Sequence, residues 1–109
     1  MLTTQHCELE FTVLQIAKSN RFDRWLSGLR DRVARAPALV RIDRLGAGNA
    51  GDIRPVGDGL SELRIDFAPG YRVYFMRKGA LMIVLLAGGD KSTQEVDIKR
   101  AKAIAKEWE

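Results

Sequence analysis

The sequence contains very little of what builds covalent or metal-bound scaffolds. It has one cysteine, Cys7, and one histidine, His6, in 109 residues. A single cysteine cannot form an intramolecular disulfide, and no cluster of residues has the ligand spacing of a zinc site. Cys7 also lacks the second histidine that a catalytic dyad would need. We therefore expect neither a metal nor a cofactor.

Long apolar runs are also missing. The longest, Ala80 to Ala87, has the length of a strand and falls well short of the ~20 residues that cross a bilayer. The N-terminus carries no basic segment followed by an apolar stretch, so a signal peptide is not expected. Together with the single cysteine, these features predict a cytoplasmic protein that makes no membrane contact.

Basic residues are what the sequence has in excess. The formal net charge is +4, and the stretch from Lys18 to Arg44 holds eight basic and three acidic residues. The length suits one domain, residues 1–109. A basic stretch of this kind indicates either affinity for polyanions or a solvated helical face that keeps the protein soluble, and the charge alone leaves both open.

Helical signals dominate the first half. A strand is expected over Glu8 to Ile16, followed by a helix that Ser19 or Asn20 can cap. A second helix is expected from about Asp31 to Leu45, and it either begins close to Pro37 or bends there. The first helix has an apolar stripe with helical spacing, formed by Phe22, Trp25, Leu26 and Leu29.

Strand signals dominate the second half. A last helix is predicted after a capping box, with Ser92 as the N-cap and Glu95 at the N3 position. The element order indicates an α+β fold, with an N-terminal strand and a helical hairpin packed on a mostly antiparallel sheet of four or five strands, and helices on one face. The predicted strands are a short one at Asp52 to Val56, then Leu60 to Phe67, Tyr71 to Arg77 and Leu81 to Ala87.

The hairpin between the second and third of these strands brings cations together. If Phe67 lies opposite Tyr71, Asp66 lies opposite Arg72 and Arg64 opposite Tyr74. Two arginines and a tyrosine then share the polar face of the sheet, which Lys91 could reach from the end of the next strand. Such a face suits phosphates and stacked bases. The alternative is that Asp66 and Arg72 form an ordinary cross-strand ion pair.

Three segments of the chain form a recognisable combination, namely residues 51–65 (GDIRPVGDGLSELRI), residues 69–75 (PGYRVYF) and residues 88–94 (GGDKSTQ). Together they resemble the RelE/HigB-type toxin superfamily, in its addiction-module killer protein branch. The similarity covers about Phe22 to Ile104, and the combination is specific although each segment alone is weak. It implies a RelE-like sheet flanked by helices, in the toxin of a type II toxin–antitoxin pair.

The resemblance also implies roles for individual residues. Arg72 would contact the scissile phosphate, Arg64 would position RNA or help to move a proton, and Lys91 would stabilise the transition state or the leaving group. The nucleophile would be the 2′-hydroxyl of the RNA itself. Further RNA contacts are expected from Arg54, Tyr74 and Asp90.

The chain departs from RelE at two catalytic positions. Asp97 stands roughly where RelE has a tyrosine, and Glu62 falls near one of its lysines. The sequence therefore lacks an obvious general base of the RelE kind, and it leaves open whether Asp90 or Arg64 serves instead.

The resemblance implies partners but does not settle the target. In the RelE and HigB branches, the toxin cuts mRNA in the ribosomal A site, and an antitoxin, usually a small DNA-binding protein of the helix-turn-helix type, neutralises it. DNA would then be contacted only through the antitoxin. The same scaffold carries ParE-type toxins, which inhibit DNA gyrase and cut nothing. A third possibility is a module that binds nucleic acid without toxicity.

Overall fold

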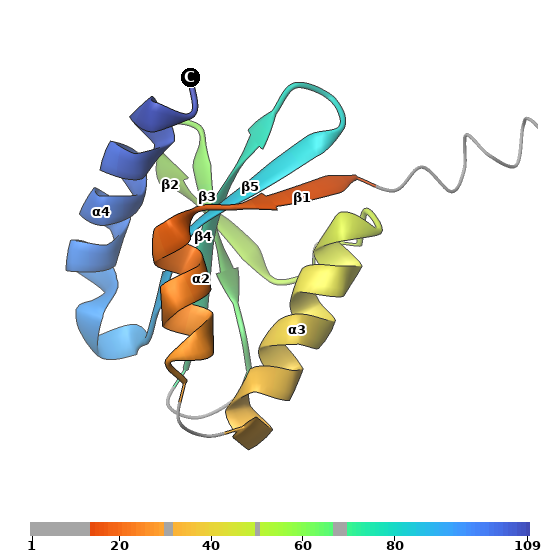
Figure 1. The fold of residues 1–109 in the computed structure, drawn as a ribbon, viewed down its shortest axis with the longest axis vertical. Helices are drawn as coiled ribbons and strands as arrows, with labels where there is room; N and C mark the ends of the chain where they lie inside the picture. Colours follow the sequence, from red (N-terminus) through yellow and green to blue (C-terminus); the bar gives the residue numbers. More distant parts are fainter. Residues whose placement is uncertain (1–13, 30–31, 50, 67–69) are drawn as a thin grey trace, which may run out of the picture.

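The computed structural model describes residues 14–29, 32–49, 51–66 and 70–109 (Figure 1). His6 and Cys7 lie outside the described residues, as do most of the strand expected at Glu8 to Ile16 and Phe67, from which the hairpin register was predicted. The first strand that the structure describes, β1, spans Gln15–Lys18.

Five strands form one sheet in the order β1-β5-β4-β3-β2. The strand β1 runs parallel to β5, and the other neighbouring pairs are antiparallel. The predicted α+β class and the mostly antiparallel sheet are therefore confirmed. The remaining strands are β2 (Ile53–Gly57), β3 (Leu60–Arg64), β4 (Arg72–Lys78) and β5 (Met82–Gly89).

Helices cover both faces of the sheet, which corrects the expectation that they pack on one face. The helices α2 (Asn20–Ser27) and α3 (Arg32–Gly46) cover one face, and α4 (Gln94–Glu107) covers the other (Figure 1). The reason is that β4 and β5 are apolar on both sides, as central strands require. Val73, Phe75 and Leu85 pack toward α2 and α3, whereas Tyr74, Val84 and Leu86 pack toward α4.

The helix α2 begins at its predicted cap, but it ends at Ser27, before Leu29, which was expected on its apolar stripe. The hydroxyl of Ser19 caps α2 by accepting a hydrogen bond of 3.0 Å from the amide of Phe22, and Gly28 follows the last turn. The helix α3 begins at Arg32, so Pro37 lies inside it rather than at its start. Because proline has no N–H, this helix lacks one of its internal hydrogen bonds.

The predicted capping box at Ser92 is wrong. A short 3-10 helix, η1 (Lys91–Thr93), precedes α4, and Asp90 caps it. The hydroxyl of Ser92 donates to Oδ1 of Asp90 instead of capping α4, whose N-cap residue is Thr93. A capping box fixes only local spacing, and an acidic residue two positions earlier competes for the same amide.

The register of the β3–β4 hairpin differs by two residues from the expected one. Arg64 lies opposite Arg72, and Glu62 lies opposite Tyr74. The loop is longer than a tight turn, since the amide of Ile65 donates to the carbonyl of Tyr71. A shift of two residues keeps every side chain on its predicted face but changes its neighbour across the strand.

Two consecutive glycines allow the helices to approach the end of β5. A Cβ atom at Gly88 would overlap the ring of Trp25 from α2, and one at Gly89 would overlap the carboxylate of Asp97 from α4. Consecutive residues of a strand point to opposite faces of the sheet. Gly88 therefore leaves room for α2 on one face, and Gly89 leaves room for α4 on the other. Neither glycine has a positive φ, so space rather than backbone conformation requires them.

Within the described part of the chain, no helix combines the length and the apolar character needed to cross a membrane.

Replacing Gly88 by alanine should destabilise the fold by about 1–3 kcal/mol, because the new methyl group forces the ring of Trp25 out of its packed position. Urea unfolding followed by tryptophan fluorescence measures the change. Gly46→Ala is the matched control, since a Cβ there meets the side chain of Ile16 at an ordinary 3.4 Å. Equal stability of Gly88→Ala and the wild type would contradict this account.

Candidate functional site

The sheet brings three of the predicted catalytic residues to one end. Arg64 closes β3 and lies opposite Arg72, the first residue of β4, which in turn lies opposite Gly89 at the end of β5. Lys91 follows Gly89 by two residues, at the start of η1. The ends of three neighbouring strands therefore place Arg64, Arg72 and Lys91 at the same edge of the molecule.

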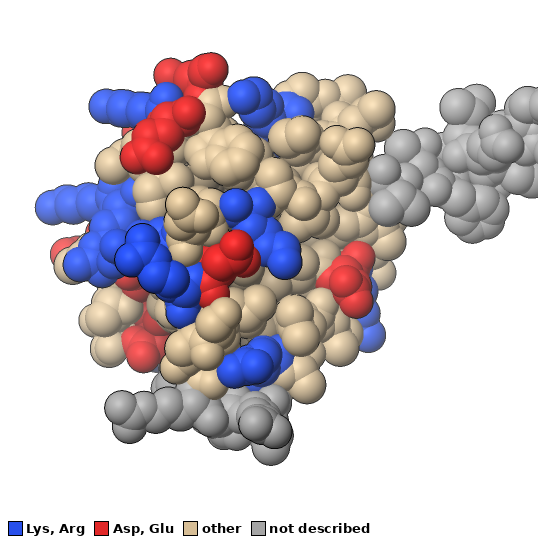
Figure 2. Space-filling model, viewed as in Figure 1, with Lys and Arg blue, Asp and Glu red and all other residues tan. Residues whose placement is uncertain are grey.

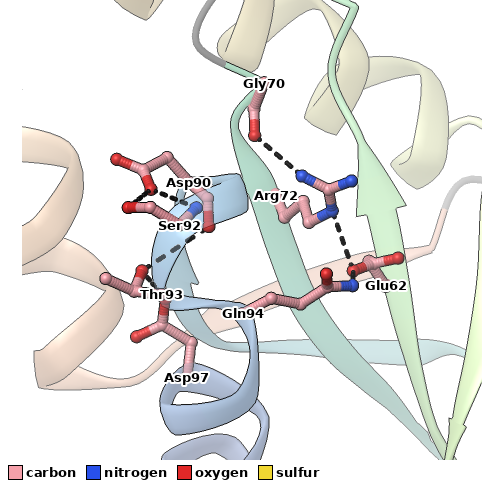
Figure 3. A network of polar contacts seen from close by, with 8 residues as sticks. All are labelled: Glu62, Gly70, Arg72, Asp90, Ser92, Thr93, Gln94 and Asp97. Carbon is pink, nitrogen blue, oxygen red and sulfur yellow. Dashed lines mark hydrogen bonds and ion pairs between the residues drawn. The ribbon is translucent and has the colours of Figure 1, made fainter.

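Arg72 is the most constrained of the three. It is 7% exposed, and its Nε lies 3.0 Å from Oε1 of Glu62. Its Nη1 donates a 3.0 Å hydrogen bond to the carbonyl of Gly70, so the guanidinium is held on two sides (Figure 3). The remaining nitrogen of the guanidinium points away from both contacts (Figure 3).

Glu62 joins Arg72 to the last helix. Its Oε1 also accepts a 2.6 Å hydrogen bond from Nε2 of Gln94, the first residue of α4. Glu62 is 2% exposed, and its carboxylate is stabilised there by one cation and one amide. A buried carboxylate requires such partners, since isolation from water would otherwise be very costly.

Lys91 is exposed and lies across a glycine from Arg72. A Cβ built on Gly70 would be 3.7 Å from Nη1 of Arg72 and 3.8 Å from Cβ of Lys91. The backbone of Gly70, with a φ of 89°, passes between the two residues. A side chain at this position would be strained and would crowd the space beside the guanidinium.

Tyr74 is not the open stacking platform that the sequence suggested. It is fully buried beneath α4, and its hydroxyl lies near the carboxylate of Glu62. Burial, with the nearby carboxylates of Glu62 and Asp97, raises the pKa of the Tyr74 phenol far above its usual range. The sheet face is thus closed where it was expected to be open, because α4 packs over it.

Asp90 is engaged in local structure. Its Oδ1 accepts hydrogen bonds from the amide of Ser92 at 2.8 Å and from the hydroxyl of Ser92 at 2.5 Å. These bonds, with the nearby charge of Arg72, lower the pKa of Asp90. A carboxylate with a lowered pKa is a weak base, which argues against Asp90 as the acceptor of a proton.

The remaining predicted residues lie farther along the sheet. Arg54 is exposed on the edge strand β2, opposite Glu62 and therefore in the same row as Tyr74. Asp66 is exposed beyond the end of β3, and it is Glu62 rather than Asp66 that pairs with Arg72. The alternative of a cross-strand ion pair was thus right about Arg72 and wrong about its partner.

Sequence reasoning missed two residues that organise the site. The alternation of β3 placed Glu62 on the correct face, but the assumed register gave it no partner. Asp97 was noted only as a departure from RelE, whereas the structure buries it to 5% exposure beneath Gly89. Its Oδ2 accepts a 2.5 Å hydrogen bond from the hydroxyl of Thr93 (Figure 3). The glycine at position 89 was the available signal, since it makes room for a neighbour.

No group of three or more histidine, cysteine or acidic residues within the described ranges could hold a metal ion.

Comparisons with known proteins give one relative and one family. A curated protein of Haemophilus influenzae (strain ATCC 51907 / DSM 11121 / KW20 / Rd), described as an uncharacterized protein, is 51% identical to the chain over 94 residues, which cover 86% of this chain and 95% of that protein. The model of the family described as phage derived protein Gp49-like (DUF891) matches residues 24–109, which include the entire site described above. The chain therefore belongs to the phage-derived Gp49-like family, a family associated with the killer proteins of toxin–antitoxin addiction modules.

Proposed function

We propose that this protein is a RelE/HigB-type toxin that cleaves mRNA on the ribosome without a metal and is neutralised by a cognate antitoxin. The observation that carries the proposal is the meeting of Arg64, Arg72 and Lys91 at one end of the sheet, with Arg72 fixed in place by Glu62. The Gp49-like family supports the coarser part, a toxin-like protein. The cleavage of RNA and its dependence on the ribosome rest on the geometry and the resemblance.

The electrostatic repulsion within the cluster of Arg64, Arg72 and Lys91 supports a functional role. Arg64 and Arg72 are directly opposite each other, and like charges in that position destabilise a sheet. Glu62 and Asp90 offset two of the three positive charges, so the cluster keeps a net positive charge. A fold that had only to be stable would gain from an apolar or oppositely charged residue at position 64. An anion bound at this edge would relieve the repulsion.

The chemistry needs cations placed before the reaction begins. The RNA 2′-hydroxyl attacks the adjacent phosphorus, a new 2′-O–P bond forms and the P–O5′ bond breaks. The leaving 5′-oxygen takes a proton from water, so the products are a 2′,3′-cyclic phosphate and a free 5′-hydroxyl. Negative charge grows on the phosphoryl oxygens during this step, and donors that are already in place stabilise it without reorganising. Arg72 fits this role because two contacts hold its guanidinium, whereas Lys91 is exposed and suits the leaving oxygen.

The pKa shifts argue against Tyr74 and Asp90 as the proton acceptor. The raised pKa of Tyr74 keeps its phenol neutral and tightly protonated, and the lowered pKa of Asp90 makes it a weak base. Of the two candidates that the sequence left open, Arg64 remains, and it is only half-buried at the end of β3. We propose that Arg64 orients the 2′-hydroxyl and that the proton passes to water or to an oxygen supplied by the ribosome.

One observation favours a second candidate function. Arg72 is almost fully buried and already paired with Glu62, as a structural ion pair would be. If that is its whole role, the chain acts by binding alone, as a ParE-type inhibitor of DNA gyrase does. The two functions differ in what they leave in the cell, which is cut mRNA in one case and damaged DNA in the other.

Induction of the wild type in a bacterium should produce new RNA 5′ ends within translated frames, and Arg72→Ala should reduce them about a hundredfold or more, because one preplaced donor to the transition state is lost. Transcriptome-wide mapping of 5′ ends measures this. Arg72→Ala also leaves Glu62 unpaired in the interior, which lowers the stability of the fold. Lys91→Ala is a second test that avoids this loss, because Lys91 is exposed. Arg77→Ala, at the opposite end of β4, is the matched control and should cleave normally.

Growth arrest with DNA-damage signalling and no new 5′ ends would replace the proposal by the gyrase alternative. A folded Lys91→Ala and a folded Arg72→Ala that both cleave like the wild type would remove the cationic cluster from the mechanism.

Replacing Glu62 by glutamine keeps the shape of the side chain but leaves the charge of Arg72 uncompensated. Breaking a buried pair in this way should cost about 3 kcal/mol or more. Equilibrium urea unfolding measures the loss. Glu95 is an exposed carboxylate in the first turn of α4, so Glu95→Gln removes the same charge without breaking a buried pair. It should lower the free energy of unfolding by well below half as much as Glu62→Gln does. Similar losses for both variants would mean that the Glu62–Arg72 pair has no special weight.

The buried Tyr74 should make the fold sensitive to alkali. The pKa of Tyr74 is higher in the folded protein than in the unfolded chain, where it is about 10. The resulting contribution to the free energy of unfolding is therefore fully present below about pH 10 and is lost as the pH rises above that value. The chain has two tyrosines, so a Tyr71→Phe variant reports Tyr74 alone. Its absorbance at about 295 nm should show phenolate only as the protein unfolds. Ionisation near pH 10 with the fold intact would contradict the burial.

A further inference from the structure

A second cationic surface lies between α2 and α4, on the far side of the Gly88–Gly89 pair from Arg72. A cavity of about 550 Å³ opens there. Its lining includes four cations, which are Lys18 at the end of β1, Arg21 and Arg24 on α2, and Arg100 on α4. We call this cavity the α2–α4 groove.

The groove exists because β1 is short. The strand ends at Lys18, and the chain turns directly into α2, which Ser19 ties to β5 through a 2.6 Å hydrogen bond from its hydroxyl to the carbonyl of Leu86. Beyond Leu85, β5 has no neighbouring strand among the described residues on its β1 side. On that side, α2 and α4 form the two walls of the groove. On α4, Asp97, Ala101 and Ala105 face the sheet. Arg100, Ile104 and Trp108, four residues apart, therefore face α2.

The cations of the groove outnumber its acidic residues, although Asp90 and Asp97 lie in the adjoining pocket that its three arginines also line. In the part of the chain that the structure describes, the guanidinium groups of Arg21 and Arg24 have no hydrogen-bond or ion-pair partner, and both residues are exposed. Arg100 is about half exposed, and its Nη1 is 3.9 Å from Oδ1 of Asp97, a weak contact. Glu107 is the one acidic residue among the described residues of the lining. Figure 2 shows Lys and Arg side chains gathered over α2 and α4.

Apolar side chains give the groove a second character. Ile104 and Trp108 are half-buried in its lining, beside Ala103. A half-buried tryptophan next to arginines forms the kind of anchor that dominates protein–protein contacts, where one apolar side chain is inserted and charges surround it. A nucleic-acid base could stack on Trp108, but the aliphatic surface of Ile104 beside it suits an apolar side chain better than a flat base.

We propose that the α2–α4 groove binds an acidic amphipathic segment of a partner protein. One apolar side chain of the segment packs on Ile104 and Trp108, and its carboxylates pair with Arg21, Arg24 and Arg100. Arginine suits this role because its planar guanidinium can accept a carboxylate with two parallel hydrogen bonds. The volume is large enough for several side chains of such a segment. The inference does not depend on whether the Arg64, Arg72 and Lys91 cluster cleaves RNA.

The first experiment measures binding of two fluorescein-labelled peptides to the full chain by anisotropy. One peptide alternates pairs of glutamate with leucine, and the other has serine in place of each leucine. The wild type should bind the leucine peptide more tightly than the serine peptide. The double variant Arg21→Glu, Arg24→Glu should bind the leucine peptide about tenfold or more weakly than the wild type does. The matched control is Arg44→Glu, Arg77→Glu, which reverses two exposed charges on α3 and β4 that do not line the groove, and it should bind normally.

Salt separates the two parts of the site. Higher ionic strength screens the arginine contacts, so the loss caused by the Arg21, Arg24 double variant should shrink as salt is added. Trp108→Ala removes an apolar contact, which salt does not screen, so its effect should persist. Thermal unfolding of each variant verifies that it is folded before binding is compared.

Three outcomes would overturn the inference. The first is equal binding of the leucine and serine peptides, or no binding of either. The second is a leucine peptide that binds the Arg21, Arg24 double variant as tightly as it binds the wild type. The third is a single-stranded RNA of the same charge that binds more tightly than the leucine peptide and loses its binding with that double variant, which would make the groove a nucleic-acid site.

Discussion

The buried pair of Glu62 and Arg72 is the contact on which the candidate site depends. Burying two charges is costly, and such a pair persists when both partners keep good contacts. Here Glu62 is bound by Arg72 and Gln94, and Arg72 also donates to Gly70. The network connects β3, β4 and the start of α4. It therefore fixes the direction of the guanidinium and ties the edge of the sheet to the helix that covers it.

The close approach at Gly88 and Gly89 gives the molecule two cationic surfaces on either side of one strand end. Because α4 comes close to Gly89, Asp97 is buried there and η1 carries Lys91 toward Arg72. Because α2 comes close to Gly88 on the other face, its arginines form a wall of the α2–α4 groove. One pair of glycines thus positions both the Arg64, Arg72 and Lys91 cluster and the groove.

The two surfaces differ in a way that matters for their ligands. Arg72 is held by short contacts in a nearly dry environment, where a fixed charge interacts strongly with charge that develops nearby. Arg21 and Arg24 are exposed and their guanidinium groups have no partners among the described residues, so they can adapt to a flexible segment but lose strength in salt. A fixed cation suits chemistry, and adaptable cations beside apolar side chains suit recognition. This division supports assigning the reaction and the docking of a partner to separate surfaces.

Local sequence patterns were enough to predict the α+β class and the face on which Arg64, Arg72 and Tyr74 lie, because alternation is a local property that burial enforces. They did not predict η1, where Asp90 rather than Ser92 is the cap. Packing between distant segments set the rest. A longer loop shifted the hairpin by two residues, which made Glu62 the partner of Arg72 and brought the two arginines opposite each other. The packing of α4 buried Tyr74 and Asp97, and the path of α2 beside β5 created the groove. These outcomes depend on contacts between residues far apart in the chain, and no periodicity within a single segment encodes such contacts.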